Sequence, residues 1–277
     1  MSQAVMLSIA GSDCSAGAGL QADLKTGTAL GCYPLTILTC AVSEVPGKVQ
    51  SIIPMEPDFV AEQLRLCMQN FPVAAIKTGM LYSPEIVRAV AGVLEELDYS
   101  GPLVIDPVMI ATAGEPLMQQ QALAAYEECL FPQATLLTPN LDELCVLMGG
   151  EHIGSRLALE HAARSLCTRY GCAVLAKGGH LAGRECVDVL APIDGENHAW
   201  TRERINGVNT HGTGCTLSSA IAAQLAQGHS LIDAVDTGLD YVATAIRHTS
   251  YWESPVAMQA LGCRCATMGN WELGIGN

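Results

Sequence analysis

Charged residues are scarce in this sequence, and basic residues are the scarcest. Lysine and arginine together number 14, against 28 aspartates and glutamates, which gives a formal net charge of −14. A nucleic-acid-binding face needs clustered positive charge, so this composition argues against a nucleic-acid partner. Any anionic ligand must instead be bound locally, by helix N-termini, backbone N–H groups and a few lysines. With 49% hydrophobic residues, the 277-residue chain can still bury a large core.

Segments that direct a chain to a membrane are also missing. No basic region precedes the short apolar stretch near the N-terminus, which predicts a first strand and not a signal peptide. No run of about 18 apolar residues suggests a membrane span. The twelve cysteines are scattered, as expected for small hydrophobic side chains in a reducing compartment, so we expect a cytoplasmic protein. Only Cys263 and Cys265 are closely spaced, and they lack the second pair of a zinc site.

Short β-rich runs alternate with longer segments of helical periodicity along the chain. This alternation predicts an α/β fold with a mostly parallel central sheet covered on both faces by helices. The expected strands are 5–10, 35–42, 74–78, 103–105, 134–138 and 173–177, with an antiparallel pair at 186–190 and 198–202; the expected helices are 19–30, 58–70, 84–97, 119–130, 141–148, 161–170, 213–227 and 231–248. No linker divides the chain, so one domain over 1–277 is predicted. Ligands of such sheets bind beyond the carboxyl ends of the strands.

Residues 11–19 read Gly-Ser-Asp-Cys-Ser-Ala-Gly-Ala-Gly, between the first strand and the first helix. Small residues allow close approach of a ligand to the backbone, and the helix N-terminus adds positive potential. The spacing differs from both common phosphate-loop patterns. An ordinary strand–helix turn is an equally good interpretation of this segment alone.

Two acidic groups follow neighbouring strands. Asp106 ends one strand, and Glu143 lies in Asn-Leu-Asp-Glu at 140–143 after the next. Separated carboxylates at adjacent strand ends can hold Mg²⁺, directly or through water. The alternative is that Asn140 and Asp142 merely cap a helix.

A lysine and a glycine-rich helix start complete the candidate site. Lys177 ends an apolar strand and precedes two glycines, so it can reach a phosphate; the alternative is an exposed turn lysine. Residues 209–216, Asn-Thr-His-Gly-Thr-Gly-Cys-Thr, open a long helix whose first N–H groups can surround a phosphoryl group. Cys215 lies in its first turn, where the helix dipole is expected to lower the thiol pKa and allow it to accept a proton. The alternative is a small packing residue.

Six motifs in this order resemble the hydroxymethylpyrimidine/phosphomethylpyrimidine kinase family of thiamine biosynthesis, a ribokinase-like family with pyridoxal kinases as close relatives. They are Gly-Ser-Asp-x-Ser-x-Gly-Ala-Gly-x-Gln-Ala-Asp-Leu-Lys-Thr near the start, Lys-Thr-Gly-Met at 77–80, Asp-Pro-Val-Met at 106–109, Thr-Pro-Asn-Leu at 138–141, Lys-Gly-Gly-His at 177–180 and the segment 209–216. The resemblance runs from about residue 4 to about residue 245.

The resemblance implies a ribokinase-like three-layer α/β/α sandwich, ATP and Mg²⁺ as cofactors, and a homodimer. The substrate is a small heteroaromatic alcohol, which receives the γ-phosphate of ATP on its hydroxymethyl group. The implied roles are a pyrimidine pocket of Gly11, Asp23, Glu44, Met80 and Val108, a Mg²⁺ site at Asp106 and Glu143, ATP contacts from Lys177, Asn140 and Thr213, and an anion hole of Gly212, Thr213, Gly214 and Cys215. Cys215 would be the base, where many ribokinase-like enzymes have an aspartate.

Two departures from the family pattern stand out. Family members commonly read Ala-Gln-Asn-Thr after the second strand, where the glutamine contacts the pyrimidine, whereas residues 43–46 are Ser-Glu-Val-Pro. The tail, about 254–277, lacks the usual Gly-x-Gly-Pro-x-x-His stretch. The first departure leaves open a pyridoxal-type kinase or a kinase of a modified pyrimidine. A non-catalytic pyrimidine-binding sensor is the alternative from another class, but a sensor has no need of Asp106, Glu143, Lys177 and the segment 212–215.

Overall fold

The computed structural model of the protein describes residues 3–109, 117–119, 121–181, 183–253 and 258–262. Its strands are β1 (Val5–Asp13), β2 (Tyr33–Val45), β3 (Lys48–Pro54), β4 (Val73–Thr78), β5 (Leu103–Ile105), β6 (Leu136–Leu137), β7 (Ala173–Lys177), β8 (Glu185–Ala191), β9 (His198–Glu203), β10 (Ser250–Trp252) and β11 (Met258–Ala260). Its helices are α1 (Gly19–Ala29), α2 (Pro57–Asn70), α3 (Pro84–Glu96), α4 (Ala122–Ala125), α5 (Leu141–Leu147), α6 (Arg156–Tyr170), α7 (Thr213–Ala226) and α8 (Leu231–Arg247), with short turns η1 (Tyr126–Leu130) and η2 (Phe131–Gln133).

Nine strands form one sheet in the order β3-β2-β1-β4-β5-β6-β7-β8-β9. The six central strands, from β2 to β7, are parallel. β3 adds an antiparallel edge on one side, and β8 and β9 add an antiparallel pair on the other. The carboxyl ends of the six parallel strands therefore meet along one edge of the sheet, where a ligand site is expected.

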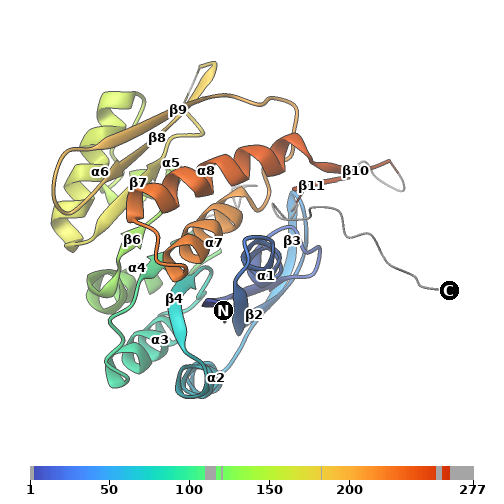
Figure 1. Cartoon of the computed structure of the whole chain (residues 1–277), viewed down its shortest axis with the longest axis vertical. Coiled ribbons are helices and arrows are strands. Elements are labelled where there is room, and N and C mark those ends of the chain that lie inside the picture. Colours follow the sequence, from blue (N-terminus) through green and yellow to red (C-terminus); the bar gives the residue numbers. More distant parts are fainter. Residues whose placement is uncertain (1–2, 110–116, 120, 182, 254–257, 263–277) are drawn as a thin grey trace.

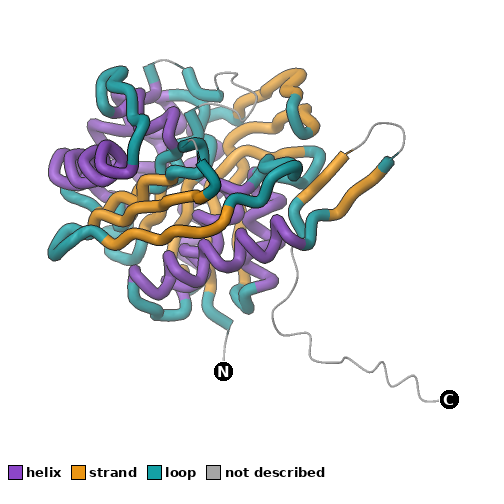
Figure 2. Tube along the Cα trace, turned by 90° about the horizontal axis from the view of Figure 1, so that it is seen from above, coloured by secondary structure: helices purple, strands orange, loops and turns teal. Residues whose placement is uncertain are grey.

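Side chains alternate between two cores, one on each face of the sheet. Leu7 and Ile9 of β1 belong to the core beneath α2, α3, α5 and α6, whereas Met6, which precedes them, packs with α7 and α8 on the other face. Figures 1 and 2 show the sheet between these helix layers, with α7 and α8 side by side. Burial on both faces explains why the central strands are continuous apolar runs. The predicted three-layer α/β/α sandwich with a mostly parallel sheet is confirmed.

Three features differ from the expected elements. β3 was not predicted, because this edge strand is largely exposed and lacks a buried alternating face. The helix expected at 119–130 is shorter: α4 has four residues and passes into a π-helical turn and then a 3₁₀ turn that contains Pro132. β10 and β11 form a separate small hairpin beyond α8. Most of the divergent tail, including Cys263 and Cys265, lies outside the described residues.

None of the helices in the described ranges has the length and apolarity needed to cross a membrane.

Candidate active site

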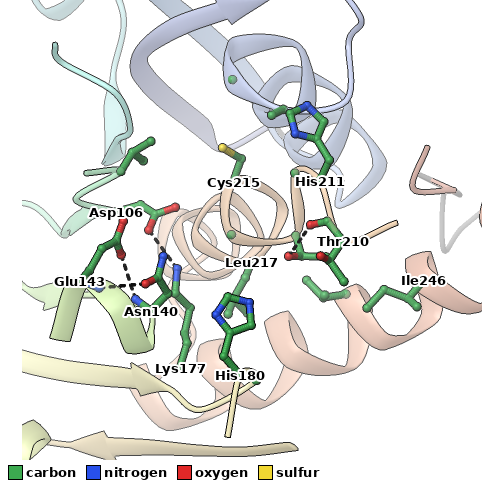
Figure 3. Close-up of a pocket in the computed structure, with 18 of the residues that line it drawn as sticks. Asp106, Asn140, Glu143, Lys177, His180, Thr210, His211, Cys215, Leu217 and Ile246 are labelled. Carbon is green, nitrogen blue, oxygen red and sulfur yellow. Dashed lines mark hydrogen bonds and ion pairs between the residues drawn. The ribbon is translucent and has the colours of Figure 1, made fainter. Parts of the chain in front are cut away.

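A cavity of about 360 Å³ lies at the carboxyl ends of the parallel strands and against the N-terminus of α7. It brings together all but one of the residues predicted for the site: Gly11, Glu44, Met80, Asp106, Val108, Asn140, Glu143, Lys177, Gly212, Thr213, Gly214 and Cys215. Figure 3 shows several of them around the start of α7, with the acidic residues and Lys177 grouped together. The exception is Asp23, which does not line this cavity.

Asp106 and Lys177 form an ion pair at the floor of the cavity. Lys177 Nζ lies 3.0 Å from Asp106 Oδ1, which also accepts a 3.2 Å hydrogen bond from the Thr138 hydroxyl. Burial opposes the charge on Lys177, but the carboxylates of Asp106 and Glu143 outweigh it and raise the lysine pKa. Lys177 is therefore a fixed cation facing the cavity and not an exposed turn residue.

Glu143 is both a capping residue and a cavity residue. Its Oε2 accepts the backbone N–H of Asn140 at 2.8 Å, while the Asn140 side chain accepts the N–H of Glu143 at 2.9 Å, a reciprocal capping box. Its Oε1 accepts the N–H of Met109 at 3.0 Å. Burial raises the pKa of Glu143. The capping alternative is thus correct for Asn140 but wrong for Asp142, whose exposed carboxylate instead lies 3.7 Å from His180.

The glycines at the start of α7 are required by close contacts. Gly212 has a left-handed φ of +84°, and a Cβ there would lie 1.8 Å from the Gly17 carbonyl oxygen. A Cβ on Gly214 would lie 3.3 Å from both Asp106 Oδ2 and Lys177 Nζ. The first turn of α7 therefore lies directly against the Asp106–Lys177 pair. No side chain caps this helix start in the described structure, so its positive end faces the cavity.

The environment of Cys215 differs from the prediction. We expected the helix dipole to lower the thiol pKa, but burial raises it to about 11, and the lowering effect of the Lys77 charge does not compensate. Asp23 and Asp106 raise it further. In the free protein the Cys215 thiol is therefore neutral at pH 7.

Asp23 does not lie where the predicted pyrimidine pocket requires it, because it is absent from the lining of the cavity. Its side chain is fully buried and forms an ion pair with the equally buried Lys77, whose Nζ lies 2.8 Å from Asp23 Oδ2. The Ser8 and Ser219 hydroxyls donate to the same carboxylate at 2.5 and 2.6 Å. Burial lowers the pKa of Lys77, but the charge of Asp23 outweighs that effect and the pKa is raised. Asp23 thus joins α1, β1, β4 and α7 inside the fold.

We expect Lys77→Met to lower the free energy of unfolding by about 3–5 kcal/mol, because it leaves the Asp23 charge buried without a partner. Denaturant unfolding followed by circular dichroism measures this loss. Combining Lys77→Met with Asp23→Leu should recover part of it. The exposed Arg65–Glu96 pair is the control, since Arg65→Met should change stability little. Equal losses for Lys77→Met and Arg65→Met would contradict this account of the buried pair.

The other four residues that the resemblance assigns to a pyrimidine pocket all line the cavity, and we call this group the acceptor end: Gly11, Glu44, Met80 and Val108. Val108 has φ +45°, an unfavourable conformation for a β-branched residue and one that is concentrated at functional sites. Glu44 lines the cavity and does not point away into solvent. Burial and the charge of Asp13 raise the pKa of Glu44 to about 7, with His211 acting in the opposite direction. The carboxyl group can therefore be protonated near neutral pH.

Sequence reasoning missed two parts of the cavity. One is an apolar wall of Leu217 on α7 and Leu239, Val242 and Ile246 on α8. Helix periodicity predicts a buried face there, but no motif distinguishes a cavity wall from core. The other is His211, which lies inside the predicted motif but was given no role.

Comparison with known proteins identifies the family. Residues 13–257 match the family model described as phosphomethylpyrimidine kinase. The chain is 41% identical to the hydroxymethylpyrimidine/phosphomethylpyrimidine kinase of Escherichia coli, over 87% of this chain and 90% of that protein. It is 42% identical to a putative hydroxymethylpyrimidine/phosphomethylpyrimidine kinase of Schizosaccharomyces pombe, over 88% of this chain but only 47% of that protein, so it spans about half of that relative's length.

A solved structure gives the same fold. The pyridoxal kinase of Staphylococcus aureus in complex with ADP superposes with a TM-score of 0.86 at 32% identity, covering 98% of this chain and 97% of that one. The ribokinase-like fold expected from the sequence is thus confirmed. The chain belongs to the phosphomethylpyrimidine kinase family.

Proposed function

We propose that this protein is an ATP-dependent kinase that phosphorylates the hydroxymethyl group of 4-amino-5-hydroxymethyl-2-methylpyrimidine, its monophosphate, or both, in thiamine biosynthesis. The observation that carries this proposal is the convergence of the Asp106–Lys177 pair with the uncapped N-terminus of α7 on one cavity. A non-catalytic sensor would not need this arrangement. The shared function of the curated relatives supports the same activity.

Phosphoryl transfer depends mainly on positioning and on charge stabilisation. The backbone N–H groups of residues 212–215 and the Lys177 ammonium, which all line the cavity, are proposed to stabilise negative charge on the transferred group. Thr213 and Asn140, which also line the cavity, are proposed to contact ATP. Cys215 is proposed as the group that takes the acceptor's proton.

Asp106 and Glu143 are proposed to serve Mg²⁺, whose role would be to neutralise charge between the ATP phosphates. Among the described residues no cluster of three or more His, Cys, Asp or Glu side chains could hold a metal by itself. A pair of carboxylates is nevertheless adequate, because protein-bound Mg²⁺ usually takes one or two carboxylates and completes its shell with phosphates and water. Both carboxylates border the cavity, so the residues present fit the ion.

The proposed activity can be tested by ADP release in a coupled assay with the pyrimidine alcohol, with and without Mg²⁺. We expect ADP production that depends on both the alcohol and the metal. Production that is equal with and without the alcohol would contradict the proposal.

Glu44 favours a second candidate, a kinase for a different heterocycle such as pyridoxine or a modified pyrimidine. A glutamine amide can both donate and accept, whereas an ionised carboxylate only accepts. Against an aminopyrimidine edge, the second oxygen of an ionised Glu44 would face a ring nitrogen lone pair. Protonation of Glu44 or of the ring relieves this repulsion, and the raised pKa of Glu44 supports the first of these.

We therefore expect Glu44→Gln to improve kcat/KM on the aminopyrimidine by about tenfold above pH 7, where Glu44 is ionised. The pKa of about 7 fixes the sign: the ratio of kcat/KM of the variant to that of wild type on this substrate should increase as pH rises through that value. The measurement is kcat/KM on the pyrimidine, its monophosphate and pyridoxine from pH 6 to 9. An unchanged substrate ranking and pH profile would remove Glu44 from the specificity determinants.

The family resemblance also supports a single kinase domain that acts as a cytoplasmic homodimer. Light scattering on the purified chain tests the dimer.

A further inference from the structure

Two loops from opposite ends of the chain meet beside the cavity. The first loop, residues 11–18, comprises the end of β1 and the turn that leads into α1. The second comprises residues 209–212, before α7. His211 Nε2 lies 2.9 Å from Asp13 Oδ2. Figure 3 shows the His211 ring reaching the N-terminal segment, away from the Asp106 group. This contact joins groups 198 residues apart in the sequence.

The Asp13 carboxylate is held in place by hydrogen bonds that it accepts from the backbone of its own loop. Its side chain is only 1% exposed, and its Oδ2 also accepts the N–H groups of Gly17 at 3.0 Å and Ala18 at 2.7 Å. Its Oδ1 accepts the N–H of Ser15 at 2.7 Å. Burial opposes ionisation of Asp13, but these hydrogen bonds and that to His211 lower its pKa to about 2. The carboxylate is therefore ionised and immobile when His211 binds it.

The backbones of the two loops are also in close contact. A Cβ on Gly17 would lie 2.7 Å from the His211 ring, just as one on Gly212 would strike the Gly17 carbonyl. The two loops therefore approach each other too closely to leave room for a side chain at Gly17 or Gly212. The spacing between them is thus set by the contacts of Asp13, Gly17, His211 and Gly212.

The first loop also contacts the acceptor end of the cavity. Cys14 Sγ lies 3.1 Å from the Glu44 carbonyl oxygen and 3.4 Å from the Glu44 N–H. Residues 13 and 14 thus connect the end of β2, which supplies Glu44, with the loop that leads into the glycine-rich start of α7. A continuous set of contacts therefore connects the acceptor end of the cavity with the proposed anion hole.

We propose that His211, held by Asp13, is a positioning residue that sets the acceptor end of the cavity at the correct distance from the anion hole of residues 212–215. This inference rests on the proposed function. Transfer requires the attacking oxygen and the phosphoryl group to be held close to their reacting geometry, and a misplacement of about 1 Å can cost on the order of 10²-fold in rate. His211 thus acts indirectly, by fixing the spacing between the two loops.

Three variants at position 211 test this role. The amide nitrogen of a glutamine takes the place of the imidazole Nε2 and can donate to Asp13; asparagine is equally polar but too short. We expect His211→Ala and His211→Asn to lower kcat by roughly 10²-fold, with KM for ATP within about threefold of wild type, and His211→Gln to recover to within about fivefold of wild type. ATP hydrolysis without acceptor phosphorylation should rise as a fraction of turnover in the first two.

Hydrogen exchange provides a readout that needs no acceptor. In His211→Ala and His211→Asn the amides of residues 15–18 and 210–213 should exchange faster, and in His211→Gln they should not. Equal exchange in all four proteins would overturn the inference, as would a kcat of His211→Asn within threefold of wild type. An equal loss of kcat in His211→Gln and His211→Asn would also overturn it. If wild type phosphorylates no alcohol tested, the proposed function fails, while the exchange data still decide whether His211 links the loops.

Discussion

Cys215→Ser is expected to retain ATP binding and to lose roughly 10²–10⁴-fold in kcat, the usual effect of removing a general base. Serine preserves the size and polarity of the first turn of α7 but is a far weaker acid than a thiol, so its anion is inaccessible. Steady-state kinetics together with calorimetric ATP affinity separate the two effects. A variant within threefold of wild type in kcat would assign Cys215 to packing.

The pH dependence provides a control for this role. With a pKa of about 11 the Cys215 thiol is neutral at pH 7, and a base must be deprotonated, so kcat should rise with pH as pH approaches that value. Cys215→Asp introduces a stronger acid and should flatten this rise between pH 7 and 9.5. A wild-type profile that is already flat over that range would show that thiolate formation does not limit the reaction.

Lys177→Ala is expected to lower kcat/KM for ATP by about 10²–10³-fold, the cost of removing a preorganised charge from a transition-state site. The loss of kcat/KM should exceed the loss caused by replacing an exposed lysine, because Lys177 is held 3.0 Å from Asp106 Oδ1 and lies beneath the first turn of α7. Steady-state kinetics with varied ATP measure it. Asp106→Asn and Glu143→Gln should instead raise the Mg²⁺ concentration needed for half-maximal activity.

Asp142→Asn is the matched control, because Asp142 is adjacent to Glu143 but exposed and directed to His180. It should leave the Mg²⁺ and ATP dependences unchanged. If Lys177→Ala, Asp106→Asn and Glu143→Gln all behave like Asp142→Asn, the phosphate and metal sites lie elsewhere.

The sequence was sufficient to predict the sheet and most of the site because both depend on local patterns. Continuous apolar runs mark strands buried on two faces, and Asp106 and Lys177 follow such runs directly, so their convergence at one sheet edge follows from the parallel topology. β3 was not predicted, because an exposed edge strand has no buried face to produce an alternating apolar pattern.

The remaining errors concern interactions between distant segments. Asp23 was assigned to the pyrimidine pocket from the resemblance, and no local signal shows that Lys77, 54 residues away, pairs with it inside the fold. The pKa of Cys215 was predicted from its helix position alone, whereas burial, a property of the whole packing, dominates. The Asp13–His211 contact spans 198 residues and is invisible to motif spacing.

A competition experiment tests the proposed function most directly. The purified chain is incubated with limiting ATP, Mg²⁺ and equal concentrations of 4-amino-5-hydroxymethyl-2-methylpyrimidine and pyridoxine, and the phosphorylated products are separated by mass spectrometry. We predict that the pyrimidine phosphate dominates and that no phosphate ester forms without Mg²⁺. Predominant phosphorylation of pyridoxine, or release of ADP without any phosphorylated alcohol, would contradict the assignment.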